Sequence, residues 1–208
     1  MKYEAIIFDI DGTILDTIAM NMYPLIKIIE EELGEKRTFD EVKHCFSMSG
    51  KQTLDHLGID YETVYPRWVQ YVNEYEKGAE PFEGIEETIR ILKDKGYRLG
   101  ICSSKKHKQY EIDMPDYLRK YFEVVVLEED CDEHKPSAKP LLLAIEKMNL
   151  EKDKVIYVGD ALGDGLCCEN GGVDFMFANW MDITIPSLPT PTYEVHHPKE
   201  IIEVLCHE

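Results

Sequence analysis

The sequence predicts a doubly wound α/β protein, with helices on both faces of a Rossmann-like parallel sheet and a helical cap subdomain inserted into it. Two observations carry this prediction. Short apolar runs rich in β-branched residues alternate along the chain with stretches of helical periodicity, as in parallel sheets. The alternation is interrupted once, between about residues 17 and 81, where only helical patterns occur. A chain of 208 residues, 44% of them hydrophobic, can bury one sizeable core and a small subdomain.

The first expected strand covers residues 5–8 and ends beside two acidic residues. In a continuing strand, Asp9 and Asp11 would share a face about 7 Å apart, but Gly12 allows the chain to turn sharply instead. Such a turn brings the Asp9 side chain and the Asp11 backbone carbonyl into one pocket, with the Asp11 carboxylate close by. A pocket of this kind suits a hard cation and a phosphoryl group.

Four helices are expected in the insertion, over residues 18–33, 39–46, 49–57 and 61–75. Pro24 and Pro66 lie inside the first and the last of them, and we expect these prolines to kink or restart both helices. A proline and glycine turn at residues 81–84 marks the return of the chain. The expected domains are an α/β core of residues 1–16 and 82–208 and a helical cap of residues 17–81.

After the insertion, the apolar runs predict four more strands, over residues 97–102, 124–127, 155–158 and 173–177. Helical patterns lie before and between them, for example over residues 85–92 and 142–148. Repeated strand, helix and strand units predict right-handed crossovers and therefore parallel strands. Three prolines between residues 186 and 191 indicate an extended surface loop.

Polar residues follow several of these strands, at the edge of the sheet where open α/β proteins bind ligands. Ser103 precedes an expected helix start, whose free N–H groups attract anions. Lys135 stands before a proline-defined helix start and can act as a phosphate clamp or as a counter-charge for a nucleophilic carboxylate. Asp160 and Asp164 follow a strand and a glycine, where carboxylates can bind or support Mg²⁺. Taken singly, a serine at this position is more often a helix cap than a catalytic residue, and the lysine is more often simply exposed. A Gly-Asp pair also makes ordinary turns.

The segment Asp9-Ile10-Asp11-Gly12-Thr13, with Asp16 three residues on, resembles the first signature of the haloacid dehalogenase-like phosphohydrolases. The segments at Ser103, Lys135 and Asp160 resemble the remaining three signatures in order, so the resemblance spans essentially the whole chain. It is strongest to the phosphoglycolate phosphatase-like branch with a helical cap. Ser104 stands where that branch often has asparagine, and Ala138 replaces a common second proline.

This resemblance implies a phosphatase that is dependent on Mg²⁺ and acts on a small phosphomonoester, such as phosphoglycolate or a sugar phosphate. Asp9 would attack phosphorus and form an aspartyl-phosphate. Asp11 would protonate the leaving oxygen and then take a proton from the hydrolytic water. Relatives that remove halide typically lack this second aspartate, so Asp11 favours phosphoester chemistry.

The resemblance also implies the ligands of the metal ion and of the phosphoryl group. Mg²⁺ would bind Asp9, the Asp11 backbone carbonyl and Asp160, with Asp164 in support. Ser103 and backbone N–H groups near Ile10 and Ser104 would hold phosphoryl oxygens, and Lys135 would offset repulsion between two anions. That repulsion is about 4 kcal/mol for unit charges ~4 Å apart at an effective dielectric constant of roughly 20.

Two alternatives remain open at this stage. A phosphosugar mutase of the β-phosphoglucomutase type would use the same core and differ in cap contacts, and a non-catalytic regulatory module would bind Mg²⁺ without turnover. A response-regulator receiver fits less well, because of the long helical insertion and the Asp-x-Asp spacing. Within the cap, Lys51 or Arg67 could contact a second anionic group of the substrate, although surface lysines and arginines more often serve solubility.

A formal net charge of −18 argues against nucleic acids and anionic membranes as partners. The basic run at residues 105–108 is expected to be mostly solvated. No signal-peptide pattern or membrane-length apolar run is visible, so a cytoplasmic location is expected. Six cysteines without a Cys-x-x-Cys pair suggest neither a zinc site nor a disulfide scaffold. The expected partner is a small phosphorylated metabolite, and the expected state is a monomer or a homodimer.

Overall fold

The computed structural model describes residues 2–76 and 78–206. The chain divides into two compact units, one formed by Met1–Leu15 and Pro81–Glu208 and the other by Asp16–Glu80. We call them the α/β unit and the helical unit. Each boundary lies one residue before the expected one. The chain passes between the units through β2 (Leu15–Asp16) and β3 (Glu80–Pro81), which form a two-stranded sheet.

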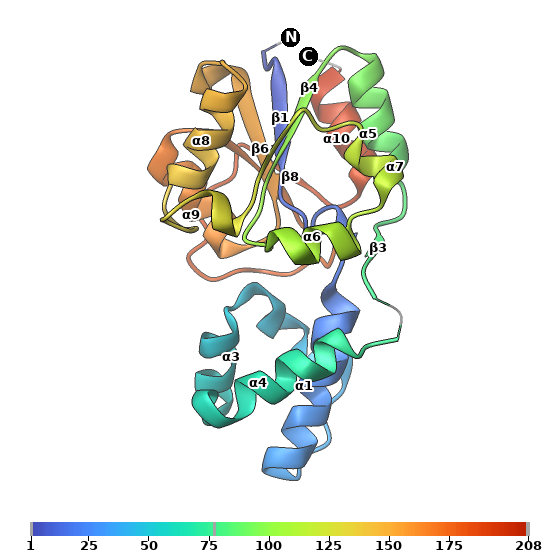
Figure 1. The fold of residues 1–208 in the computed structure, drawn as a ribbon, viewed down its shortest axis with the longest axis vertical. Helices are drawn as coiled ribbons and strands as arrows, with labels where there is room; N and C mark the ends of the chain where they lie inside the picture. The colour runs from blue at the N-terminus through green and yellow to red at the C-terminus, as the bar shows by residue number, and fades with distance from the viewer. Residues whose placement is uncertain (1, 77, 207–208) are drawn as a thin grey trace. The chain divides into compact units, whose positions relative to one another are not determined.

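The α/β unit is built on a six-stranded sheet with the strand order β5-β4-β1-β6-β7-β8 (Figure 1). The strands are β1 (Ala5–Phe8), β4 (Arg98–Cys102), β5 (Val124–Val126), β6 (Val155–Gly159), β7 (Asp174–Ala178) and β8 (Tyr193–Val195). Neighbouring strands are parallel, and Phe8 at the end of β1 lies opposite Ile101 of β4 and Val158 of β6. The residues that follow these three strands therefore share one edge of the sheet.

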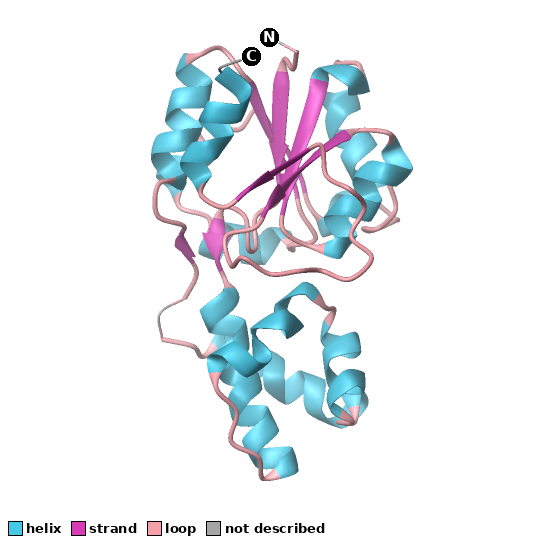
Figure 2. Ribbon diagram, turned by 180° about the vertical axis from the view of Figure 1, so that it is seen from behind, coloured by secondary structure: helices cyan, strands magenta, loops and turns pink. Residues whose placement is uncertain are grey.

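Helices cover both faces of this sheet (Figure 2). One face packs against α8 (Lys139–Lys147) and α9 (Leu162–Gly171), and the other is covered by α5 (Ile85–Asp94) and α10 (Pro198–Cys206) (Figure 1). Ile7 belongs to the core beneath α8 and α9, whereas Phe8, one residue later, contacts the Phe122 ring edge to face. Successive residues of a strand point to opposite faces, so β1 is buried on both sides. The predicted doubly wound parallel sheet is confirmed.

The structure extends the sheet by one strand that the sequence does not predict. β8 has three residues, among them Glu194, and offers no apolar run. Its position depends on pairing with β7, since Thr192 donates its N–H to the Phe175 carbonyl over 2.7 Å. The other predicted strands are correct to within one residue at each end. Shorter helices complete the unit, namely α6 (His107–Asp113), α7 (Asp116–Arg119), η2 (Glu128–Asp130) and η3 (Lys152–Lys154).

The helical unit contains α1 (Ile18–Leu33), α2 (Phe39–Val42), η1 (Lys43–Ser47), α3 (Gly50–Leu57) and α4 (Tyr61–Asn73). Ser49 caps α3 by accepting the N–H of Gln52, as a serine at this position favours. Within the described residues, no helix has the length and apolar character needed to cross a membrane.

Neither proline of the helical unit restarts its helix, so that half of the expectation that they kink or restart the helices is wrong. α1 continues through Pro24, and α4 continues through Pro66. The two helices pack together through buried apolar residues, and the Trp68 indole on α4 donates to the Asn21 carbonyl on α1 over 3.2 Å. A proline costs a helix one backbone hydrogen bond, and this packing offsets the cost.

Candidate active site

Asp9 lies directly after the central strand and is nearly excluded from solvent. Its N–H donates to the Val158 carbonyl over 2.9 Å, which continues the pairing of β1 with β6, and the residue is 8% exposed. The chain then turns, with Gly12 at φ 78° and the N–H of Ile14 bonded to the Ile10 carbonyl. A positive φ suits glycine, so Gly12 permits the turn that separates Asp9 from Asp11.

Lys135 places its ammonium among the polar groups that follow β1 and β6. Its Nζ lies 3.1 Å from Asp9 Oδ1 and donates to Asp164 Oδ1 over 2.6 Å and to the Tyr157 hydroxyl over 2.5 Å. Burial lowers the pKa of this ammonium, but the Asp164 and Asp9 carboxylates outweigh burial and hold it well above its usual value. Lys135 is therefore a buried, permanently charged cation beside Asp9.

Asp164 holds this cation in place from the first turn of α9. Its Oδ2 accepts the backbone N–H groups of Asp160 and Ala161 over 3.2 and 3.0 Å, while Oδ1 accepts from Lys135. A Cβ at Gly159 would lie 2.6 Å from the Asp164 carboxylate, so only glycine fits there. Since both oxygens of Asp164 are occupied, the geometry favours a supporting role over direct contact with a metal ion.

Three carboxylates could hold a cation at this edge of the sheet. Asp9, Asp160 and Asp164 each offer an oxygen within 4.8 Å of the others. Asp9 Oδ1 is buried and accepts no hydrogen bond from the described residues. Hard oxygen donors of this kind are the ligands that Mg²⁺ prefers. The residues present therefore fit a divalent cation, with Asp9 and Asp160 as the carboxylates best placed to bind it.

The same cluster raises the pKa of its carboxyl groups. Burial raises the pKa of Asp9 to about 6, with Asp164 and Asp11 acting in the same direction and Lys135 and the Ser103 hydroxyl opposing them. Burial, followed by the charges of Asp164 and Asp9, raises the pKa of Asp160 well above its usual range. Negative charge therefore exceeds what Lys135 compensates, and a bound cation would relieve the excess.

Asp160 is oriented by a residue from the turn after β1. The Thr13 hydroxyl donates to Asp160 Oδ1 over 2.8 Å, and the Thr13 carbonyl accepts the Trp180 indole N–H over 3.1 Å. These two bonds connect the turn after β1 with the segments after β6 and β7. The Thr13 hydroxyl occupies Asp160 Oδ1, and no described residue donates a hydrogen bond to Asp160 Oδ2.

Ser103 is buried after β4, and Ser104 beside it is exposed. The Ser103 N–H donates to the Val126 carbonyl over 3.0 Å, so the residue continues the pairing of β4 with β5. Both serines and Lys135 line a single cavity of about 10 Å³. The structure thus brings together Asp9, Ser103, Lys135, Asp160 and Asp164, all of which the sequence singles out.

The burial of Lys105 contradicts one expectation from the sequence. The run at residues 105–108 is expected to be solvated, and Lys106, His107 and Lys108 are indeed exposed. Lys105 is buried instead, and its Nζ contacts Asp11 Oδ1 at 2.8 Å and Asp113 Oδ2 at 2.7 Å. Burial lowers the pKa of Lys105, but these two carboxylates outweigh burial and raise it. The Asp11 side chain is thus paired with a lysine that the sequence does not single out.

The helical unit holds the other residues that the sequence suggests for substrate contact. Lys51 lies on α3, exposed, and pairs with Asp55 at 2.6 Å. Arg67 on α4 pairs with Glu31 at 3.6 Å and with Glu32. Lys51 already has an acidic partner one turn along α3, and Arg67 has two on α1. A role of either residue in substrate binding stays a prediction.

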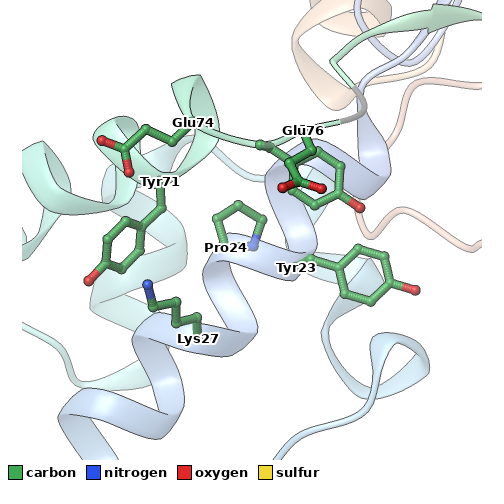
Figure 3. A pocket seen from close by; sticks show the side chains of 7 residues that line it. Tyr23, Pro24, Lys27, Tyr71, Glu74 and Glu76 are labelled. Atoms are coloured by element: carbon green, nitrogen blue, oxygen red, sulfur yellow. The ribbon is translucent and has the colours of Figure 1, made fainter.

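A separate pocket of about 430 Å³ lies within the helical unit, between α1 and the end of α4 (Figure 3). Tyr23, Lys27, Tyr71 and Glu74 are among its lining residues, and the Lys27 ammonium lies 3.6 Å from the centroid of the Tyr71 ring. Among its described lining residues, none is a predicted site residue. The Lys27 ammonium and the Tyr71 ring form a cation–π interaction with each other.

The sequence analysis predicts no role for four polar residues around the candidate site, namely Thr13, Lys105, Asp113 and Tyr157. Tyr157 lies in the middle of an apolar run, and its hydroxyl contacts Cys102 O, Asp164 Oδ1 and Lys135 Nζ. The one available signal was the hydroxyl itself, because a buried tyrosine usually finds a polar partner.

The fold and this site together define a class of hydrolase that works at the carboxyl edge of a parallel sheet. Residues 6–178 match the family described as haloacid dehalogenase-like hydrolase, and the chain belongs to this family. The predictions of this family and of a hydrolytic enzyme are therefore confirmed.

Individual relatives are similar to the chain over nearly its full length. A protein of Caldanaerobacter subterraneus subsp. tengcongensis, provisionally named pyrophosphatase PpaX, is 27% identical over 216 residues, which cover 99% of this chain and 96% of that protein. The pyrophosphatase PpaX of Halalkalibacterium halodurans is 26% identical over 178 residues, covering 83% and 82%. The crystal structure of a provisionally named phosphoglycolate phosphatase from Lactobacillus plantarum has a TM-score of 0.81 and 25% identity, and covers 99% of this chain and 100% of that one.

Proposed function

We propose that the protein is a Mg²⁺-dependent phosphatase that hydrolyses a small phosphomonoester through an aspartyl-phosphate on Asp9. The observation that carries the proposal is Asp9 Oδ1, a buried carboxylate oxygen that accepts no hydrogen bond from the described residues and lies 3.1 Å from the Lys135 ammonium. A nucleophile needs a free lone pair, and an anion that approaches a phosphate needs a neighbouring positive charge. Asp9 meets both requirements.

In the first step, an Asp9 carboxylate oxygen forms a bond to phosphorus while the bond from phosphorus to the leaving oxygen breaks. Asp11 gives its proton to that leaving oxygen. In the second step, Asp11 takes a proton from water, the water oxygen bonds to phosphorus, and the aspartyl bond breaks to release inorganic phosphate. Asp9 and Asp11 end in their starting states, so the two steps close a catalytic cycle.

The surrounding residues have supporting roles in this proposal. Lys135 offsets the negative charge of the phosphoryl group, and Asp164 with Tyr157 keeps the Lys135 ammonium in place. The Ser103 hydroxyl and the N–H groups near Ile10 and Ser104 hold phosphoryl oxygens. A bound Mg²⁺, with Asp9, Asp160 and the Asp11 carbonyl as its protein ligands, supplies charge neutralisation and orientation.

The substrate is a small phosphate compound, and its remainder would be recognised by the helical unit acting as a cap. Phosphoglycolate and sugar phosphates are the expected phosphomonoesters. Inorganic pyrophosphate belongs in the same test, because two of the similar proteins carry the name pyrophosphatase. A cytoplasmic location and a monomeric or homodimeric state are further expectations for such an enzyme.

The test is phosphate release from phosphoglycolate, several sugar phosphates and pyrophosphate, with MgCl₂ or with EDTA. We expect turnover by the wild type in Mg²⁺, its reversible loss in EDTA, and acid-stable trapping of labelled phosphate that Asp9→Asn abolishes. Asp11→Asn should keep the fold and lose turnover. Wild-type turnover by Asp9→Asn would contradict the role of Asp9. Silence of the wild type across the panel, with Mg²⁺ bound, would favour the mutase or the regulatory module.

A further inference from the structure

Lys105 is the second buried lysine at the carboxyl edge of the sheet. It follows β4, and its ammonium bridges two carboxylates, Asp11 after β1 and Asp113 at the end of α6, at 2.8 and 2.7 Å. Asp113 is itself held, because the Gln109 amide donates to both of its oxygens over 2.9 and 3.0 Å. A chain of polar contacts therefore leads from α6 through Lys105 to the carboxylate of Asp11.

The backbone of Lys105 is fixed at both ends. Its N–H donates to the Ser103 hydroxyl oxygen over 3.3 Å, and its carbonyl accepts the Glu128 N–H over 3.1 Å. The lysine is thus tied to the serine beside Asp9 and to the segment after β5. A side chain anchored in this way loses little further freedom when its ammonium is held, so it can orient another group.

The charge balance argues against Lys105 as a ligand of the substrate. One ammonium faces two carboxylates, and the lysine side chain is 7% exposed. Binding a substrate anion would require Lys105 to give up one of these partners and leave it unpaired, which is costly in a buried site. Lys105 is therefore committed to Asp11 and Asp113.

Asp11 is held on one side only. Its Oδ1 accepts from Lys105 over 2.8 Å, its side chain is 36% exposed, and no described residue donates a hydrogen bond to its Oδ2. Two oxygens of one carboxylate thus differ in environment, one fixed by a cation and the other open. A general acid contributes only when it lies within hydrogen-bond reach of the leaving oxygen.

We propose that Lys105, held by Asp113, is a positioning residue that fixes the carboxylate of Asp11 and directs its open oxygen toward the leaving group. The proposal rests on the phosphatase function proposed above and adds a residue to it. Lys105 contacts neither phosphorus nor the leaving oxygen, so its influence on the reaction passes through Asp11. Its contribution should therefore depend on how much the leaving group needs a proton.

The test uses two aryl esters that differ in this need. Phenyl phosphate has a poor leaving group and requires protonation, whereas p-nitrophenyl phosphate has a good one and requires little. We expect Lys105→Met to lower kcat/KM about 10-fold or more for phenyl phosphate and less than about threefold for p-nitrophenyl phosphate, since general acids contribute roughly 10²–10⁴-fold. Lys105→Arg should restore part of the loss, and Lys106→Met, the exposed neighbour, should match the wild type.

A double-mutant cycle separates positioning from a structural role. Adding Lys105→Met to Asp11→Asn should cost no further activity on phenyl phosphate, because groups that act as a unit are not additive. If Lys105→Met does not fold, Asp113→Asn removes the anchor and should show a smaller loss with the same leaving-group selectivity. Equal losses on both esters, or a further loss in the Asp11→Asn background, would overturn the positioning role alone. A wild type inactive on both esters and on the phosphate compounds tested above would overturn the proposed function, and the positioning role with it.

Discussion

The two units of the chain differ in how deeply their ion pairs are buried. In the α/β unit, Lys135 and Lys105 are buried, and the side chains of Asp9, Asp164 and Asp113 that face them are 12% exposed or less. In the helical unit, pairs such as Lys51 with Asp55 lie in water, with more than half of each side chain exposed. Buried charges cost several kcal/mol unless they are well paired, whereas exposed pairs contribute about 1 kcal/mol or less.

This difference separates what each unit can contribute. Charged groups that are buried and fixed in this way can stabilise the charge of a substrate more strongly than groups in water. The pocket of the helical unit has three tyrosines among its lining residues, and the ring centroids of two of them, Tyr23 and Tyr75, lie 6.1 Å apart. Substitutions in the α/β site should therefore affect rate, and substitutions in the helical unit should affect choice of substrate.

The largest effect should come from Asp9→Asn. Removing the nucleophile should lower kcat by about 10⁴-fold or more, because the remaining groups cannot form the aspartyl bond. Phosphate release on the best substrate measures it. Asp174→Asn is the matched control, since Asp174 pairs with Lys2 and Tyr3 in the same unit and should leave kcat unchanged. If the two variants had comparable kcat values, Asp9 would matter no more to the reaction than an acidic residue outside the site, and its role as nucleophile would be wrong.

A smaller effect is expected from Asp160→Asn, which removes one proposed metal ligand and keeps the acceptor for Thr13. The Mg²⁺ concentration for half-maximal activity should rise by at least about 10-fold. Titration of activity with MgCl₂ measures this shift, and Asp153→Asn, an exposed aspartate before β6, is the control. An unchanged Mg²⁺ requirement would remove Asp160 from the metal site.

Tyr157→Phe tests whether the buried tyrosine helps to hold Lys135. The hydroxyl accepts from Lys135 and can donate to either Cys102 O or Asp164 Oδ1, so its removal should lower kcat roughly 10-fold and stability by about 1 kcal/mol. Tyr97→Phe is the control, because Tyr97 lies at the opposite end of β4 from Ser103 and its hydroxyl donates to the Leu205 carbonyl. We expect Tyr97→Phe to lower stability similarly and to leave kcat unchanged. Equal kcat values for both variants would assign Tyr157 to packing alone.

Tyr157 and Lys105 mark the limit of what the sequence could predict. Asp9, Ser103 and Asp160 directly follow apolar runs, and strand ends in a parallel sheet meet at one edge, so local patterns indicated where these residues lie. Their roles, and the choice of Lys135, depended on the resemblance to the haloacid dehalogenase-like family. Tyr157 lies within such a run, where alternation predicts burial but not the reach of a hydroxyl. Its partner Lys135 is 22 residues away, and their contact depends on the crossover through α8.

Lys105 was missed for a different reason. It stands in a run of basic residues that are otherwise exposed, and its partner Asp11 is 94 residues away. Only the pairing of β4 with β1 brings the two together. The fold was easier to predict, because five strands of the six-stranded sheet carry their own apolar signal and only β8, which has three residues, lacks one.

The raised pKa of Asp9 predicts how the stability of the protein depends on pH. Burial raises the pKa of Asp9 to about 6, above its value in the unfolded chain, so the folded protein binds this proton more tightly. In EDTA, the contribution of Asp9 to stability should therefore increase as the pH falls from 7 toward 5. The measurement is the wild-type Tm minus the Asp9→Asn Tm at each pH. We expect a rise of a few degrees in EDTA and a weaker rise in Mg²⁺, because the metal ion competes with the proton. A difference that stays flat in EDTA would contradict the raised pKa.

The smallest effect should come from Lys51→Met in the helical unit. Lys51 is exposed and pairs with Asp55 one turn along α3, so Tm should not change measurably. If the unit acts as a cap, losing this charge should lower kcat/KM about threefold for substrates with a second anionic group, such as phosphoglycolate, and leave p-nitrophenyl phosphate unchanged. Lys43→Met, which breaks a similar pair with Asp40, is the matched control. A substrate profile that is unchanged by Lys51→Met would remove Lys51 as a contact and leave Arg67 as the next candidate. An equal loss of kcat/KM for p-nitrophenyl phosphate would instead mean that the helical unit takes part in the chemistry. The assignment of rate to the α/β unit and of substrate choice to the helical unit would then be wrong.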